Sequence, residues 1–277
     1  MKKLLNAVAV AAALVGASTA NAGTLVTDWG YSVTTQWQVP FTTFSAGSGT
    51  QTSTSSLISW GAAGGDHTVT NAASTAARSA LEITNSPATG PVATNTFTDP
   101  ISTPPPAYGL TAVMTHYNNT LDGGFATMTK TRVETALTLT PTNPAGPTLP
   151  TVMKVFGIDF KETPNISGTC AAPSATTCDD IFVVSLGDLT QSFDYDGFHY
   201  TVGIFEVSGN LDVLSNAQCL AAGAAIGCIG LTTPEKEHTP VQFAFFINAV
   251  ELPEPAGLAL FAAALFALGA TVRRKSS

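Results

Sequence analysis

The sequence predicts an all-β fold, most simply a sandwich or a jelly-roll-like pair of sheets. Between residues 23 and 252, a Gly, Pro, Asn or Asp recurs every 8 to 15 residues and separates short β-branched and aromatic runs. This is the pattern of strands joined by turns. Several runs alternate apolar and polar residues, as strands do when one face lies on a core. No convincing amphipathic helix interrupts them, which disfavours a helical or α/β fold.

The clearest strand has Val133, Thr135, Leu137 and Leu139 on one face, and the runs around 156–160 and 243–247 alternate in the same way. Two stretches rich in Thr, Ser, Gly and Pro, 45–56 and 86–107, are predicted to be long surface loops. Asp194-Tyr195-Asp196-Gly197 predicts a hairpin turn, because Asp-Gly supplies the positive φ that tight turns require. Predicted strands cover residues 31–39, 110–115, 132–140, 153–160, 181–186, 198–207 and 241–250.

Composition excludes nucleic acid as a partner. The chain has 277 residues, a net charge of −8 and only 11% charged residues. Five of its eleven cations lie at the two ends, so the body between them is acidic and lacks the clustered basic surface that phosphate neutralisation needs. The 230 residues of this body, 23–252, are enough for one β-rich exported domain with its own core, or at most for two small domains.

Residues 1–22 have the three parts of a secretory signal peptide. Lys2 and Lys3 form the positive region, an apolar run extends over 4–15, and Ala20-Asn21-Ala22 is a small-residue cleavage site. The mature chain is therefore expected to begin near Gly23.

The C-terminal segment 253–277 predicts a membrane helix with a positive stop. Pro253-Glu254-Pro255 precedes seventeen uncharged residues, 256–272, which are followed by Arg273-Arg274-Lys275. Seventeen helical residues extend roughly 25 Å, at the short limit for crossing a hydrocarbon core. The two prolines keep Glu254 out of helix and sheet, so the triplet stays extended and accessible.

This order of parts resembles the PEP-CTERM sorting signal of Gram-negative bacteria. The resemblance implies a substrate of the membrane enzyme exosortase, which is thought to cut near the triplet and deliver the protein to the cell surface or extracellular matrix. Exosortase and the inner membrane are then the expected partners, with the tail helix either transient or retained. Pro253, Glu254 and Pro255 would be the sorting motif, and Arg273, Arg274 and Lys275 the basic stop.

Four cysteines lie in the exported part, and their even number indicates disulfides. Sequence proximity favours Cys170 with Cys178 and Cys219 with Cys228, although three connectivities are formally open. Zinc is the weaker alternative, because neither spacing is Cys-x-x-Cys and no His lies beside either pair. Closing such short loops stabilises by roughly 2–3 kcal/mol each.

Thr115-His116-Tyr117-Asn118 resembles the signature of the THxN family of PEP-CTERM proteins, which has no assigned reaction. Further landmarks of that family are Ser59-Trp60-Gly61, the run at 178–182, and Gly227-Cys228 followed by Glu235. If the strand continues, His116 and Asn118 share a face and can converge on one ligand. We favour the other interpretation, in which Asn118 and Asn119 form a turn whose side chains satisfy local backbone groups.

No cofactor is expected. Calcium is the alternative, with Asp179, Asp180, Asp194 and Asp196 as oxygen ligands, but the full alternating ligand loop is absent. Hydrolytic motifs such as Gly-x-Ser-x-Gly or His-Glu-x-x-His are also absent from the sequence, so we expect no catalytic residues.

The expected function is that of an exported, non-enzymatic surface or matrix protein of a Gram-negative bacterium. The PEP-CTERM resemblance implies association with exopolysaccharide and biofilm. The alternative is a lectin-like β-sandwich module that uses exposed Trp29, Trp37 or Trp60 as stacking platforms. A secreted polysaccharide hydrolase, based on acid pairs such as Asp179-Asp180, is a third and weaker reading.

Overall fold

The computed structural model describes residues 23–96, 105–163, 170–174 and 178–252. The predicted signal peptide, sorting motif, membrane segment 256–272 and basic stop lie outside these residues. Within the described part of the chain, no helix is long and apolar enough to cross a membrane.

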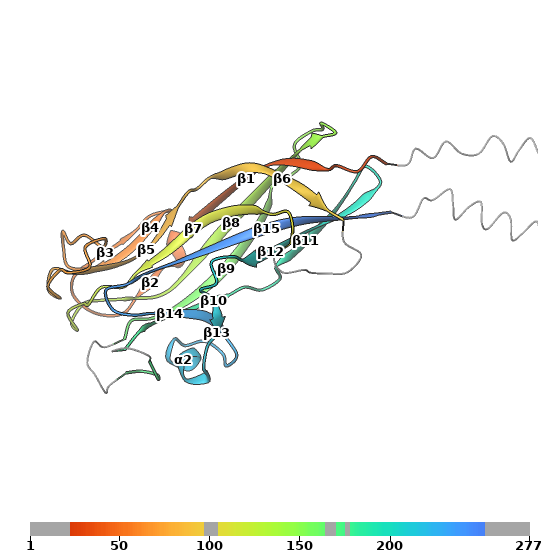
Figure 1. Cartoon of the computed structure of the whole chain (residues 1–277). Helices are drawn as coiled ribbons and strands as arrows, with labels where there is room; N and C mark the ends of the chain where they lie inside the picture. Colours follow the sequence, from red (N-terminus) through yellow and green to blue (C-terminus); the bar gives the residue numbers. More distant parts are fainter. Residues whose placement is uncertain (1–22, 97–104, 164–169, 175–177, 253–277) are drawn as a thin grey trace, which may run out of the picture.

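The described chain is predominantly β-structure, which confirms the predicted fold class (Figure 1). A 3₁₀ turn, Val39–Phe41, and one short helix, α2 at Asn216–Ala221, accompany the strands. The strands are β1 Asp28–Trp37, β2 Thr43–Phe44, β3 Thr50–Ser53, β4 Leu57–Gly61, β5 Arg78–Thr84, β6 Ala88–Asn95, β7 Gly109–Tyr117, β8 Met128–Asn143, β9 Val152–Lys161, β10 Asp180–Ser185, β11 Thr190–Tyr195, β12 Phe198–Glu206, β13 Asp212–Val213, β14 Ile229–Thr233 and β15 His238–Glu251.

Hydrogen bonding links these strands into one large sheet, in the order β13-β14-β10-β9-β8-β1-β6-β15-β7-β5-β4-β3. Strand β6 joins its two halves, because it pairs antiparallel with β1 and parallel with β15 at Thr94 and Asn95. Strands β11 and β12 extend the second half from β15, and β2 pairs with β8.

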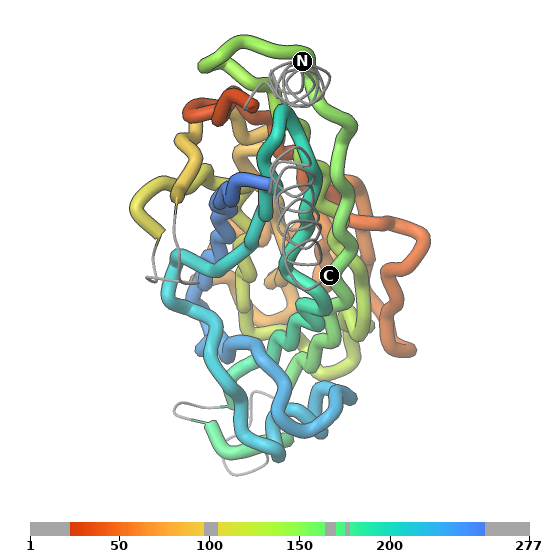
Figure 2. The backbone as a smooth tube through the Cα atoms, turned by 90° about the vertical axis from the view of Figure 1, so that its right-hand side faces the viewer, coloured from red at the N-terminus to blue at the C-terminus, as the bar shows by residue number. Residues whose placement is uncertain are grey.

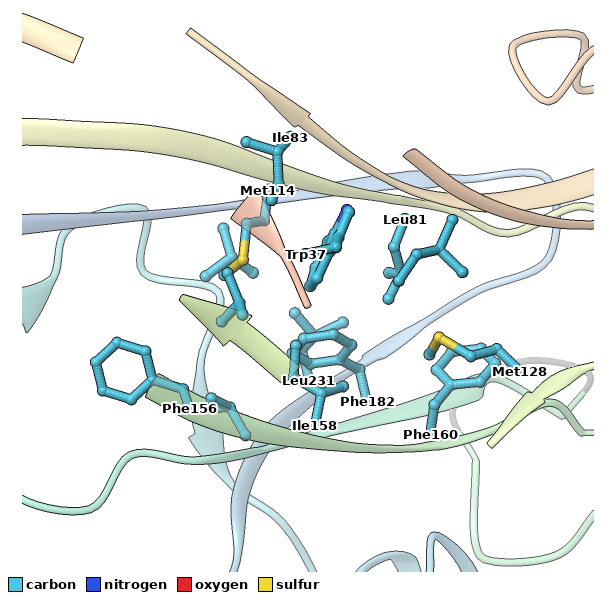
Figure 3. Close-up of a cluster of buried hydrophobic side chains, with 14 of the residues drawn as sticks. Trp37, Leu81, Ile83, Met114, Met128, Phe156, Ile158, Phe160, Phe182 and Leu231 are labelled. Atoms are coloured by element: carbon cyan, nitrogen blue, oxygen red, sulfur yellow. The ribbon is translucent and has the colours of Figure 1, made fainter. Parts of the chain in front are cut away.

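The two halves face each other across a shared apolar core, an arrangement consistent with the expected sandwich. Leu81, Ile83 and Met114, from β5 and β7, lie opposite Phe156 and Ile158 of β9 (Figure 3). A second cluster around Trp29 and Phe245 fills the space between β1, β8, β12 and β15. Burying large apolar side chains at about 25 cal/mol per Å² is the main source of stability in such a core.

The two predicted loops were wrong in part, because each contains a strand. Residues 45–56 include β3, which pairs with β4, and residues 86–107 include β6. Threonine is β-branched and suits an exposed strand face, so a Thr-rich stretch does not exclude a strand. Pro91 is tolerated inside β6 because β6 pairs with β15 only at its last two residues, so among the described residues no strand pairs with that side of β6 at Pro91.

The β11–β12 hairpin holds both ends of the described chain. Asp196 and Gly197 have φ of 44° and 80°, which confirms the predicted turn. The Thr24 N–H donates to the Asp196 carboxylate at 3.1 Å, and the Leu252 N–H donates to the Gly197 carbonyl at 2.9 Å. Figure 2 looks onto this end of the molecule, where the red first residues and the blue end of β15 lie beside the hairpin.

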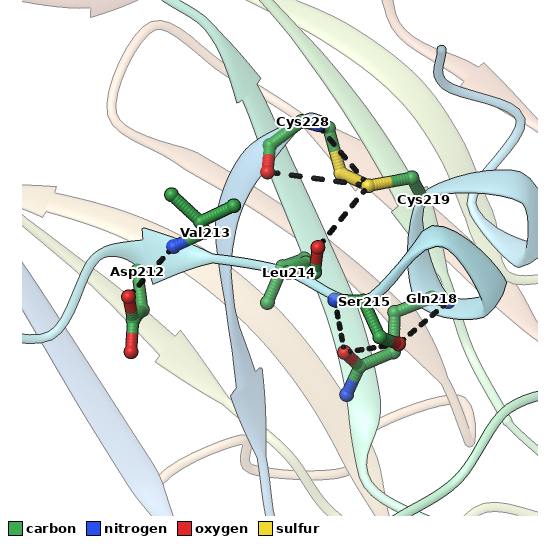
Figure 4. The surroundings of a disulfide bond; sticks show 7 residues. All are labelled: Asp212, Val213, Leu214, Ser215, Gln218, Cys219 and Cys228. Atoms are coloured by element: carbon green, nitrogen blue, oxygen red, sulfur yellow. Dashed lines mark hydrogen bonds between the residues drawn. A yellow bond between two sulfur atoms is a disulfide. The ribbon is translucent and has the colours of Figure 1, made fainter. Parts of the chain in front are cut away.

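Both predicted disulfides are present, joining Cys170 to Cys178 and Cys219 to Cys228. The second ties α2 to the chain before β14 (Figure 4). Ser215 caps this six-residue helix, because its hydroxyl accepts from the Gln218 N–H while the Gln218 side chain accepts from the Ser215 N–H. Disulfides of this kind are typical of proteins folded outside the reducing cytosol.

Candidate functional site

The Thr115-His116-Tyr117-Asn118 motif lies at the end of β7. His116 continues the inward face that begins with Ala112 and Met114, and is 2% exposed. Thr115 is half-buried and pairs with Pro240 of β15. The chain then stays attached to the segment before β15, because the Asn118 N–H donates to the carbonyl of Glu237 and its carbonyl accepts from the Lys236 N–H.

The favoured local-turn interpretation of Asn118 and Asn119 is wrong. The Asn118 carboxamide donates to the Thr233 carbonyl at 2.8 Å. The Asn119 carboxamide donates to the Arg78 carbonyl at 2.7 Å and to that of His67 at 2.8 Å. These partners are 40 or more residues away, because buried strand ends expose carbonyls that only a neighbouring segment can satisfy.

Three carboxylates converge beside this motif. Glu162 directly follows β9, Asp180 is the first residue of β10, and Glu235 lies between β14 and β15. The β9–β10 register pairs Phe160 with Phe182, so its continuation places Glu162 opposite Asp180. One ligand oxygen from each of the three residues lies within 4.8 Å of the others.

Each carboxylate has one oxygen held by a hydrogen-bond donor. The Trp60 indole N–H donates to Glu162 Oε2 at 2.9 Å, and the Thr163 N–H donates to Asp180 Oδ1 at 2.8 Å. The Thr120 hydroxyl donates to Glu235 Oε2 at 2.9 Å. By contrast, Glu162 Oε1 and Asp180 Oδ2 are buried and have no hydrogen-bond partner among the described residues.

His116 packs between the aromatic side chains next to this cluster. Its ring stacks on Trp60 at a centroid distance of 6.4 Å and meets Phe160 edge-on at 5.0 Å. Its Nε2 lies 3.8 Å from Asp180 Oδ2, which is too long for a hydrogen bond. Neither ring nitrogen has a hydrogen-bond partner in the described part of the chain.

Burial disfavours charge throughout the site. It raises the pKa of Glu162 to about 8, although the Trp60 hydrogen bond opposes the shift. Burial and then the charge of Glu162 raise the pKa of Asp180 well above its usual value, and burial also raises that of Glu235. Burial, followed by the charge of His238, lowers the pKa of His116 to about 3, so its imidazole is neutral at pH 7.

These groups can either share protons or hold a cation. A hydrogen bond between Glu162 and Asp180 requires a proton on one of them, because two carboxylates only accept. A bound cation would instead need both ionised. A cavity of about 610 Å³ borders the cluster and is lined by Glu162, Thr120, Phe160, Lys161 and Thr163, among other residues, so the site has a route to the surface.

The sequence landmarks therefore meet in one place. Trp60, His116, Asp180 and Glu235 come from four separate family-like motifs, and the structure brings their side chains together around Asn118. Sequence reasoning missed Glu162, which stands alone between a strand and a polar stretch. The sequence signal that could have identified Glu162 was its position two residues after Phe160. Because strand side chains alternate, Glu162 extends the buried face of β9 on which Phe160 lies.

Other residues singled out in the sequence do not join this site. Asp194 pairs with His199 at 2.6 Å and Asp196 holds the N-terminal segment, both in the β11–β12 hairpin. In the described part of the chain Asp180 converges instead with Glu162 and Glu235, so the four aspartates are not gathered into one ligand set there. Trp29, Trp37 and Trp60 are 0–2% exposed, so none of them is a stacking platform for a glycan.

No protein-family model matches the chain, and no curated protein matches it significantly. The likeness to the PEP-CTERM and THxN patterns stays a prediction from the residues quoted above.

Proposed function

We propose that the protein is an exported, non-enzymatic component of the cell surface or extracellular matrix of a Gram-negative bacterium. In this proposal the signal peptide directs export, and an exosortase acts at Pro253-Glu254-Pro255. The β-domain is then delivered to the surface and associates with exopolysaccharide or biofilm.

The observation that carries the proposal is the position of the domain's two ends. Gly23 and Leu252 lie together beside the β11–β12 hairpin, and the chain leaves the domain there toward the predicted sorting tail. The C-terminal end of β7 and the N-terminal end of β15, which adjoin the candidate site, lie at the opposite end of the molecule (Figure 1). A domain held by its tail would therefore present this site away from the membrane. The two disulfides are compatible with such an extracytoplasmic location.

The sorting step can be tested by replacing Pro253 and Pro255 with Ala in the full chain. We expect the variant to stay in the inner membrane with its tail intact, because the triplet can then continue the helix. The wild type should appear at the surface or in the medium. Fractionation with terminal-peptide mass spectrometry measures both. Pro147→Ala with Pro150→Ala, two exposed prolines within the domain, is the matched control and should sort normally.

Surface delivery of the Pro253/Pro255 variant equal to that of the wild type would contradict the sorting proposal. The matrix role needs a separate measurement. The processed protein should leave the matrix fraction when the polysaccharide is enzymatically removed, and failure to co-fractionate with polysaccharide at all would contradict that role.

A further inference from the structure

We propose that Glu162, Asp180 and Glu235, with the carboxamide oxygen of Asn118, form a binding site for a divalent cation, and that this cation is calcium. The inference goes beyond the export role and does not depend on it.

The spacing of the three carboxylates suits one shared ion. Calcium binds oxygens at about 2.3–2.6 Å, so two oxygens on the same ion are at most about 5 Å apart. The ligand oxygens of Glu162, Asp180 and Glu235 lie within 4.8 Å of one another. They come from three segments that strand pairing holds in place: the end of β9, the start of β10 and the β14–β15 connection.

The second observation is a group of buried polar atoms without partners. Asp180 and Asn118 are both 0% exposed, yet Asp180 Oδ2 and Asn118 Oδ1 have no hydrogen-bond partner among the described residues. Glu162 Oε1 is also buried and has no hydrogen-bond partner among these residues. Asp180 Oδ2 and Glu162 Oε1 are both acceptors, so they cannot satisfy one another without an added proton or cation. Asn118 adjoins the cluster through Glu235, with which its carboxamide interacts. The available donors of Trp60, Thr163 and Thr120 already bind the opposite oxygens.

The surroundings of the site favour calcium over other occupants. The converging ligand atoms are oxygens, which calcium prefers, whereas zinc favours sites with nitrogen or sulfur ligands. His116 approaches Asp180 to 3.8 Å but is not part of the converging set, so we assign it to positioning Asp180 through packing. A proton shared between Glu162 and Asp180 is the competing occupant, because their side chains lie close enough to hydrogen-bond when one of them is protonated.

A bound ion would cross-link several strand ends at the end of the domain that lies away from Leu252. Asn118 follows β7, Glu162 follows β9, Asp180 begins β10 and Glu235 precedes β15. Without the ion, the three carboxyl groups can lie this close together only by taking up protons. Calcium would therefore order the end of the domain that points away from the predicted tail.

Terbium luminescence tests the proposal, because Tb³⁺ replaces calcium on oxygen ligands and is excited by a nearby indole. The Trp60 indole lies within hydrogen-bond distance of Glu162, so bound Tb³⁺ should emit on excitation of tryptophan. The exported protein, purified from cells and freed of metal with EGTA, is titrated with Tb³⁺ and then with Ca²⁺. We expect saturable emission that Ca²⁺ abolishes and the same concentration of Mg²⁺ reduces less. With a Kd of about 0.1 mM, typical of extracellular calcium modules, 10 mM Ca²⁺ should raise the Tm by about 5–10 °C.

Two variants and one control make the test specific. Asp180→Asn and Glu235→Gln should each lose the Tb³⁺ emission and the calcium-dependent rise in Tm. Their Tm without metal should be equal to or above that of the wild type, because each replaces one of three carboxyl groups crowded into a buried site with an uncharged amide. Asp194→Asn removes an exposed carboxylate in the β11–β12 hairpin and should behave as the wild type.

Three results would overturn the proposal. The first is no saturable emission and no calcium-dependent change in Tm for the wild type, which would leave a shared proton in the site. The second is unchanged binding in both Asp180→Asn and Glu235→Gln. The third is a larger stabilisation by Zn²⁺ than by Ca²⁺ that is lost in His116→Gln, which would make the imidazole a ligand and reject calcium.

Discussion

Arg78 provides a sharp test of how the β3–β4–β5 region is held together. The residue is 7% exposed, and all its donors are used in five hydrogen bonds of 2.9–3.2 Å. They reach Thr50 and Thr52 of β3, Ser59 of β4, and the carbonyl of Ala62. No carboxylate pairs with Arg78 in the described part of the chain, and burial lowers its pKa. The guanidinium therefore acts through its planar set of donors rather than through an ion pair.

Replacing Arg78 with Lys keeps the charge but changes the donor geometry. An ammonium has three donors, so at least two of the five hydrogen bonds are lost. Hydrogen bonds to charged groups contribute about 1.5–3 kcal/mol each. Two of the five, those to Thr50 and Thr52, are only part-buried, which favours the lower half of that range. We expect the free energy of unfolding to fall by about 3–4 kcal/mol.

Urea denaturation of the disulfide-intact protein measures this difference, and the Tm should fall by about 6–16 °C for a domain of this size. Arg132→Lys is the matched control. Arg132 is exposed and its guanidinium lies 4.1 Å from the Phe41 ring centroid, an interaction that contributes about 0.5–1 kcal/mol. An Arg78→Lys variant within 1 kcal/mol of the wild type would refute the reasoning, as would equal losses in the two variants.

Three further predictions concern single contacts. Asn119→Ala removes one buried and one part-buried amide donation to backbone carbonyls and should lower the free energy of unfolding, measured with urea, by about 2–4 kcal/mol; a loss below 1 kcal/mol would contradict it. Cys219→Ser with Cys228→Ser should cost about 2–3 kcal/mol, and a variant as stable as the oxidised wild type would reject this role. Tyr200→Phe should cost about 1–3 kcal/mol, because the Tyr200 hydroxyl accepts from the buried Val26 N–H. Burial raises the pKa of Tyr200, so its contribution is complete below its unfolded pKa near 10 and is lost as pH rises through the higher folded pKa. The stability difference between wild type and Tyr200→Phe, measured by denaturation from pH 8 to 12, should therefore narrow above about pH 10, and a constant difference would contradict this assignment.

Much of the fold could be predicted from local patterns. Each of the seven predicted strands overlaps an observed strand, because alternation of apolar and polar residues directly reflects a strand with one buried face. The Asp196-Gly197 turn was predictable for an equally local reason, because Asp and Gly readily adopt the positive φ that the turn requires. The other eight observed strands, β2, β3, β4, β5, β6, β11, β13 and β14, were not predicted. Two of them, β3 and β6, lie in stretches predicted to be loops, since their Thr, Gly and Pro residues resemble loop composition and only pairing with β4 and β1 makes them strands.

The candidate site was predictable only in pieces. His116 and Asn118 were recognised as a motif, and Asp180 and Glu235 as landmarks, but nothing local links them. The preference for a turn at Asn118 failed because turn statistics describe exposed Asn residues, whereas this one is buried and bonds to Thr233.

By itself, the sequence determined the β-class of the domain and its Asp196-Gly197 turn, favoured the observed pairing of its cysteines, and predicted the export and sorting signals. These properties depend on residues that are close together along the chain, so they can be predicted from periodicity and spacing in the sequence. Only the tertiary structure decided that Glu162, Asp180 and Glu235 meet beside His116, and that the ends of the domain lie together far from them. The physical reason is strand register, which is set by packing of the whole core and brings together residues that are far apart along the chain.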